Sequence, residues 1–89
     1  MVTVEFAASL RRHVQCGAQL VPPGGLRETL MTALAAAPGL AHYVLDDQGS
    51  VRKHVAVFVN KVLVLDRVRL DLQLHAGDRV LVAQALSGG

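Results

Sequence analysis

The sequence is poor in the residues that most often carry chemistry. It has three aromatic residues (Phe6, Tyr43 and Phe58), no tryptophan, and Cys16 as its one cysteine. A lone cysteine excludes an intrachain disulfide and a cysteine-ligated iron–sulfur site within one chain. The net charge is only +2 and the basic residues are scattered, whereas nucleic-acid binding needs a concentrated basic face. We therefore expect a core of Val, Leu and Ala, and no nucleic-acid partner.

Apolar runs long enough to span a membrane are also missing, and Glu5 lies where a secretion signal would be apolar. The sequence therefore predicts a cytoplasmic protein with no membrane association. Its 89 residues, 52% hydrophobic and 18% charged, are enough for one globular core. We expect a single domain over residues 1–86, followed by a tail over residues 87–89.

Candidate catalytic and metal-binding residues do not cluster along the sequence. The histidines share no ligand spacing with one another, with Cys16 or with the acidic residues, so we expect no metal site. A catalytic pair between Cys16 and a histidine stays open, although a free cysteine in a strand is most often a small core residue. The stretch 22–25 (PPGG) lacks the spacing of phosphate-binding loops. We expect a protein that is not itself an enzyme.

Hydrophobic periodicity predicts an α+β domain. Alternation predicts strands at residues 2–6, 14–21, 51–60, 62–65 and 79–85. One helix is expected at residues 26–37, ended by Pro38-Gly39, with an apolar stripe of Leu26, Leu30, Leu34, Met31 and Ala37. Residues 40–50 read as a loose connection. This order predicts a β-grasp fold, a mixed sheet of about five strands with the first and last parallel at its centre and one helix across one face.

The turn between the strands at 51–60 and 62–65 falls on Asn60-Lys61. A type I′ turn prefers glycine at its second position, so we expect this hairpin turn to be looser than type I′.

Gly88 and Gly89 are the last two residues of the sequence, and they follow an apolar strand. A carboxylate at Gly89 is a reactive group if another enzyme activates it as an acyl-adenylate. Glycine suits a narrow active site because it has no Cβ and adopts positive φ freely. An extended tail from Gln84 to Gly89 would reach roughly 17–20 Å at about 3.3 Å per residue. We expect Gly89 to be the reactive residue, and Ser87 and Gly88 to be small neighbours that let the tail enter the narrow active site of a partner enzyme.

Three stretches resemble the ThiS/MoaD family of ubiquitin-like sulfur carriers: VFVN at 57–60, HAGDRVLV at 75–82 and ALSGG at 85–89. The resemblance extends over essentially the whole chain. The sequence departs from the family at residues 82–85, where molybdopterin carriers often have aromatic residues and proline. It departs again at Lys61, where a glycine often follows the asparagine. The stretch 49–60 (GSVRKHVAVFVN) is more similar to a branch that donates sulfur for amino-acid synthesis, notably of cysteine.

The resemblance implies a carrier that binds no cofactor itself. An E1-like adenylating enzyme would use ATP and magnesium to adenylate the Gly89 carboxylate. A sulfur donor, either a sulfurtransferase or a sulfide source, would then replace AMP and leave a thiocarboxylate. A sulfur-accepting synthase would take that sulfur for an amino acid, molybdopterin or thiamine. The chain would be at most the small subunit of a sulfur-transfer complex.

Alternation along the strands also predicts a surface for partner proteins on the sheet face away from the helix. We expect a docking patch of Phe58, Leu81, Ala83 and Leu86, with a rim of Arg52, His54 and Arg79. A homodimer interface, or ordinary two-sided strands in a small sheet, would give the same pattern.

Two further functions stay open at the level of the sequence. A protein modifier would share the fold and the activation step, with Gly89 joined to a lysine amine. A non-covalent β-grasp interaction or RNA-binding module would make no use of Gly88 and Gly89.

Overall fold

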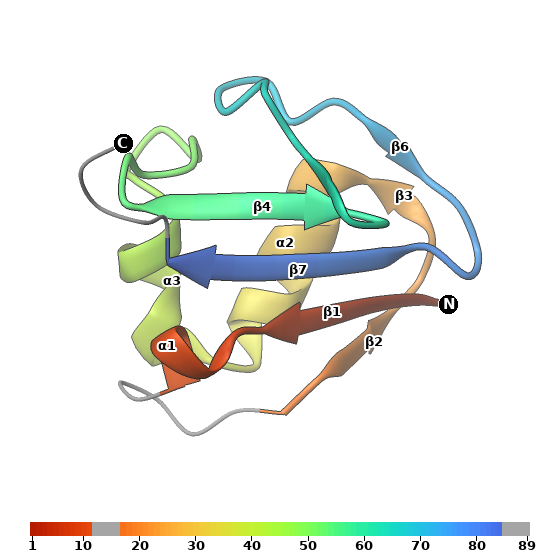
Figure 1. The fold of residues 1–89 in the computed structure, drawn as a ribbon, viewed down its shortest axis with the longest axis horizontal. Helices are drawn as coiled ribbons and strands as arrows, with labels where there is room; N and C mark the ends of the chain where they lie inside the picture. Colours follow the sequence, from red (N-terminus) through yellow and green to blue (C-terminus); the bar gives the residue numbers. More distant parts are fainter. Residues whose placement is uncertain (12–16, 85–89) are drawn as a thin grey trace.

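Two parallel strands from the two ends of the described chain form the centre of the fold (Figure 1). The structure is a computed structural model that describes residues 1–11 and 17–84. Strand β1 (Val2–Phe6) pairs in parallel with β7 (Arg79–Gln84), with Val4 opposite Val80. Alternate residues of both strands are buried, as their sequence pattern predicts.

Three antiparallel strands complete a five-stranded sheet in the order β2-β1-β7-β4-β5. Their bounds are Gln19–Val21 for β2, Val55–Val59 for β4 and Val62–Leu63 for β5. This sheet, with its parallel pair at the centre, confirms the predicted β-grasp fold.

All three of these strands are shorter than predicted, and the strand expected at 62–65 ends at Leu63. The strand expected at 51–60 begins only at Val55, because Val51 forms an isolated bridge with Leu45 instead. The strand expected at 14–21 is seen at Gln19–Val21, and its residues 14–16 lie outside the described part of the chain.

Helix α2 (Leu26–Ala35) packs across one face of the sheet. Its buried side chains include Leu26, Leu30 and Leu34, which are four residues apart and so lie on one stripe. Met31 was predicted in that stripe, but 55% of it is exposed, because it lies about 100° around the helix from Leu30. Ala37 is buried, but it lies beyond the end of the helix.

The prediction of a single helix was wrong. Residues expected to form a loose connection form α3 (Pro38–Val44), and a short helix α1 (Ala8–Arg11) follows β1. Pro38 was interpreted as a helix terminator, but it begins α3 at the first helical position, where a missing N–H costs nothing. Leu40 and Val44 of α3 are completely buried in the core.

The long connection between β5 and β7 holds the start of α2. It contributes β6 (Gln73–Leu74), which pairs with β3 (Gly24–Gly25) just before the helix. Gly25 is the N-cap and has no side chain to offer, so the first helical N–H groups need other acceptors. The Leu26 N–H donates to the Leu72 carbonyl at 2.8 Å and the Arg27 N–H to the Leu70 carbonyl at 3.1 Å. Backbone from a distant segment therefore caps α2.

The arrangement of α2 predicts a large loss of stability when Leu30 is truncated and a small one when its neighbour Met31 is truncated. Leu30→Ala should lower the free energy of unfolding by about 3 kcal/mol, because it leaves a cavity under a completely buried side chain. Met31→Ala should change it by less than about 0.5 kcal/mol. Urea denaturation of both variants measures this, and equal losses would contradict the placement of the helix.

Candidate functional site

The face of the sheet away from the helices carries the predicted docking patch. Figure 1 shows α2 and α3 behind the sheet, and none of the labelled helices and strands lies in front of β7. In β7, Val80 and Val82 are buried toward the helices, whereas 38% of Leu81 is exposed on the other face. Leu81 lies opposite Phe58 of β4, and Ala83 lies opposite Ala56. Because directly paired residues share a face, the structure brings Phe58, Leu81 and Ala83 together there.

Leu63 of β5 extends this apolar surface, and sequence reasoning missed it. It lies opposite Phe58 and 44% of it is exposed. Leu63, Phe58 and Leu81 therefore form an apolar row across three adjacent strands. A tight turn at Asn60-Lys61 would have predicted this register, since a two-residue loop sets Phe58 opposite Leu63.

The turn at Asn60-Lys61 is tight, contrary to expectation. Val59 pairs directly with Val62, and the backbone φ angles of Asn60 and Lys61 are 49° and 70°. Positive φ at both central residues is what a type I′ hairpin turn requires. Asparagine adopts this conformation readily, whereas lysine does so only at a cost in conformational energy. With lysine in place of glycine, the turn keeps its tight geometry, and Lys61 has a strained backbone conformation.

A hollow of about 520 Å³ lies beside this turn and includes Phe58 and Leu81 of the apolar row. We call it the hairpin hollow, and it is lined by Glu5, Phe58, Asn60, Lys61, Arg79, Val80 and Leu81. Arg79 Nη1 lies 3.8 Å from Glu5 Oε1, and the Arg79 side chain is largely exposed while the Glu5 side chain is half exposed. Such an exposed ion pair contributes about 0–1 kcal/mol to stability, so its main effect here is on local charge.

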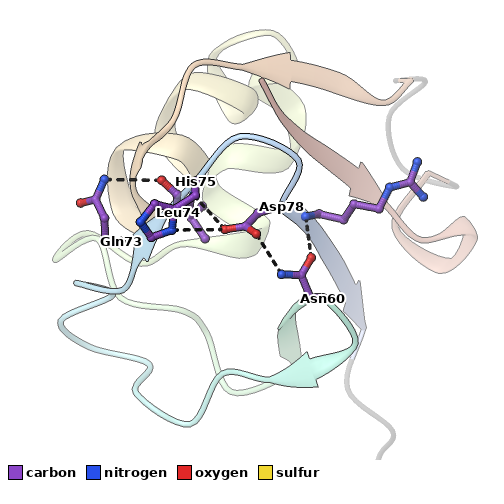
Figure 2. Close-up of polar contacts among 6 residues, drawn as sticks. Asn60, Gln73, Leu74, His75 and Asp78 are labelled. Carbon is purple, nitrogen blue, oxygen red and sulfur yellow. Dashed lines mark hydrogen bonds and ion pairs between the residues drawn. The ribbon is translucent and has the colours of Figure 1, made fainter.

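A set of hydrogen bonds fastens the hairpin to the start of β7 (Figure 2). Asn60 Nδ2 donates to Asp78 Oδ1 at 3.0 Å, and Asn60 Oδ1 accepts from the Arg79 N–H at 2.9 Å. The other Asp78 oxygen accepts from the His75 N–H at 2.8 Å. We call the Asn60 and Asp78 side chains with these bonds the Asn60–Asp78 clamp. It ties together two turns that are distant in sequence.

The clamp changes the acidity of Asp78. The hydrogen bond from the His75 N–H, and then that from the Asn60 side chain, lower the pKa of the Asp78 carboxyl from its ordinary value. Both donors favour the charged carboxylate, which explains the direction. A pKa that is lower in the folded protein means that the clamp stabilises the fold above the ordinary pKa. That stabilisation is lost as pH falls through the lowered value.

Of the predicted rim residues, Arg79 lies beside the patch, whereas the side chains of Arg52 and His54 contact α3. Arg79 lies beside Phe58 and Leu81 in the hairpin hollow. Arg52 and His54 precede β4, at the end where Val55 lies opposite Gln84. Arg52 Nε donates to the His42 carbonyl at 2.6 Å, and the His54 ring packs edge-on against Tyr43 at 4.5 Å. Both side chains therefore contact α3. Lys61, which was not among the predicted site residues, lines the hairpin hollow together with Arg79.

The tail predicted to carry the chemistry lies outside the described residues. This applies to Leu86, Ser87, Gly88 and Gly89, to the domain boundary at 86/87, and also to His13 and Cys16. Strand β7, the last element that the structure describes, ends at Gln84, at the end of the sheet where β4 begins.

Over residues 1–11 and 17–84, no three His, Cys, Asp or Glu side chains converge as a metal site would require. No helix in this same part of the chain is long and apolar enough to cross a bilayer.

The clamp predicts a specific pH dependence of stability. Asp78→Asn should be less stable than the wild type at neutral pH, because a donating amide NH2 would replace one of the two carboxylate oxygens that accept from Asn60 and His75. The difference should shrink below pH 4 or so, as the wild-type carboxylate becomes protonated. Denaturation at a series of pH values measures both profiles. Parallel profiles would show that the clamp does not act through the carboxylate.

Comparison with known proteins places this geometry in a structural group. No family model and no curated protein matches the sequence. Among solved structures, CysO in its complex with BexX from Amycolatopsis orientalis has 19% identity, 100% coverage of both chains and a TM-score of 0.79. CysO from Mycobacterium tuberculosis has 22% identity, 97% coverage of this chain and 100% of its own, and a TM-score of 0.78.

Small archaeal modifier protein 1 from Haloferax volcanii has 21% identity, covers 99% of this chain and 98% of its own, and has a TM-score of 0.77. At this level of sequence identity, the comparison establishes a shared fold. The chain therefore has the ubiquitin-like β-grasp fold of these proteins, and the fold expected from its resemblance to the sulfur carriers is confirmed.

Proposed function

We propose that this protein is a sulfur carrier, activated at the carboxylate of Gly89. The observation that carries the proposal is the placement of β7. Its outward side chains contribute to an open apolar row, and the strand leads from Gln84 toward the segment that contains Gly88-Gly89. One strand thus connects a docking surface to a candidate reactive group.

The chemistry would proceed in two steps on a partner enzyme. A Gly89 carboxylate oxygen attacks the α-phosphorus of ATP, which is bound with magnesium by an E1-like partner, and pyrophosphate leaves. A hydrosulfide equivalent from a sulfur donor then attacks the acyl-adenylate carbonyl, and AMP leaves. The product is a Gly89 thiocarboxylate. The thiocarboxylate sulfur then attacks an acceptor substrate on the accepting synthase and displaces its leaving group, and water cleaves the resulting thioester, which restores the carboxylate and leaves the sulfur on the acceptor.

The carrier contributes binding and reach, and the partners supply the catalysis. The described residues lack a cluster of metal ligands, and the two acids whose pKa is lowered, Asp66 and Asp78, owe this to backbone hydrogen bonds that they accept in connecting segments. The exposed row of Leu63, Phe58 and Leu81 provides the apolar surface that a partner would cover. A slim glycine tail would enter the partner while the domain stays outside.

Fold likeness to CysO and the similarity of residues 49–60 to the cysteine branch favour sulfur donation for cysteine synthesis over the molybdopterin and thiamine pathways. A protein modifier is the second candidate, favoured by the likeness to small archaeal modifier protein 1. It differs in the nucleophile alone, because a lysine amine would attack the acyl-adenylate and form an isopeptide bond.

Intact mass spectrometry of the protein isolated from its own cells, with its natural C-terminus, tests the carrier function. We expect a mass increase equal to the exchange of one oxygen for sulfur, localised by fragmentation to Gly89. A variant with one alanine added after Gly89 is the control and should show none. Isopeptide adducts on other proteins would favour the modifier. Absence of both products, with wild-type behaviour of the extended variant, would favour the non-covalent module.

The apolar row predicts a second, separate effect. Leu81→Asp should lower the thiocarboxylated fraction by about tenfold, because a carboxylate at the β7 end of the row opposes burial by a partner. Its free energy of unfolding should fall less than that of a core variant, since 38% of Leu81 is exposed in the free protein. Leu20→Asp, on the edge strand β2, is the matched control and should act like the wild type. Equal thiocarboxylation in both variants would show that the row is not used.

A further inference from the structure

The hairpin hollow combines an apolar floor with two cationic side chains. Phe58 and Leu81 provide the floor, and Lys61 and Arg79 line the same hollow. Glu5 pairs with Arg79, so the hollow keeps one positive charge in excess. Over the residues that the structure describes, Lys61 forms no ion pair.

Lys61 is held in a conformation that lysine does not favour. Its φ of 70° lies in the left-handed region, where glycine has no steric penalty. A strained residue of this kind persists where its surroundings impose the conformation, and such residues gather at binding sites. Here the lysine side chain is kept at the edge of the hollow, in a turn where glycine would be the more stable choice.

The Asn60–Asp78 clamp sets the spacing of the two cations. Asn60 directly precedes Lys61, and Asp78 directly precedes Arg79. The Asn60 side chain bonds both Asp78 Oδ1 and the Arg79 N–H, so the two turns cannot separate without breaking hydrogen bonds. The backbone positions from which the two cationic side chains extend are therefore held together beside the apolar floor, which reduces the backbone entropy lost when a partner binds.

We propose that the hairpin hollow is the anchor site for a partner-protein segment with one bulky apolar side chain next to a carboxylate. The apolar side chain packs on Phe58 and Leu81, and the carboxylate pairs with Lys61. A volume of about 520 Å³ lies in the range that holds a small ligand or an anchoring side chain with its neighbour. A second copy of this chain fits less well, because isologous packing would bring the cationic patch against itself.

The identity of this partner as an activating or accepting enzyme rests on the proposed function, but the chemistry of the hollow does not. Binding can therefore be measured with peptides and the whole protein.

The probe is acetyl-Gly-Leu-Asp-Gly-amide, and the controls replace Asp by Asn or Leu by Ala. In ¹⁵N NMR titrations we expect saturable shifts at the amides of Lys61, Arg79 and Leu81. Each control peptide should bind about fivefold more weakly or worse. Absence of saturable shifts at these amides overturns the proposal.

Variants of Lys61 separate binding from folding. Lys61→Glu should lower the affinity for the Asp-containing probe peptide by about tenfold. Lys53→Glu makes the same charge change in an exposed turn and should leave that affinity unchanged. Lys61→Gly should keep or raise the melting temperature, because it removes the strained φ, and yet bind the Asp peptide more weakly. Wild-type affinity in either Lys61 variant would contradict the assignment.

The two proposals fail in different ways. If the peptide binds at the hollow but no thiocarboxylate forms in cells, the sulfur-carrier function is rejected and the anchor-site proposal stands. Equal thiocarboxylation of Lys61→Glu and the wild type would keep the carrier and reject the hollow as the anchor for its partner.

Discussion

The parallel pairing of β1 with β7 is the constraint on which the rest of the molecule depends. Parallel neighbours cannot be joined by a hairpin, so the chain between them must cross over, and here that crossover contains α2, α3 and the remaining strands. Both strands are central, and β7 is bonded along both of its edges. A shift of one residue would turn Val80 and Val82 outward, so burial of these two valines fixes the register.

That register also determines the open face. With Val80 and Val82 inside, Leu81 must face solvent, and pairing with β4 and β5 brings Phe58 and Leu63 into line with it. An apolar row on a small sheet is thus a by-product of the core on the opposite side. Lys61 and Arg79, beside Phe58 and Leu81, then give the row a charge preference, and β7 continues from Leu81 to Gln84, at the end of the sheet where β4 begins.

Elements held together by local pattern could be predicted from the sequence, and elements that depend on distant contacts could not. The leucines of α2 recur every four residues, so the buried stripe was predictable, apart from Met31 at its margin. Helix α3 was missed because Pro38-Gly39 suits a helix end as well as a helix start. Only burial of Leu40 and Val44 in the core distinguishes the two.

The sequence by itself determined the alternation of β1 and β7, the helical stripe and the candidate reactive glycine, since each depends on neighbours in the chain. The tertiary structure alone decided which side chains meet. Lys61 and Arg79 share a hollow because hydrogen bonds join Asn60 to Asp78 across 18 positions of the chain. Likewise α2 begins at Leu26 because the carbonyls of Leu70 and Leu72 cap it. Contacts of this kind form only when the sheet brings distant backbone together, and no local pattern encodes them.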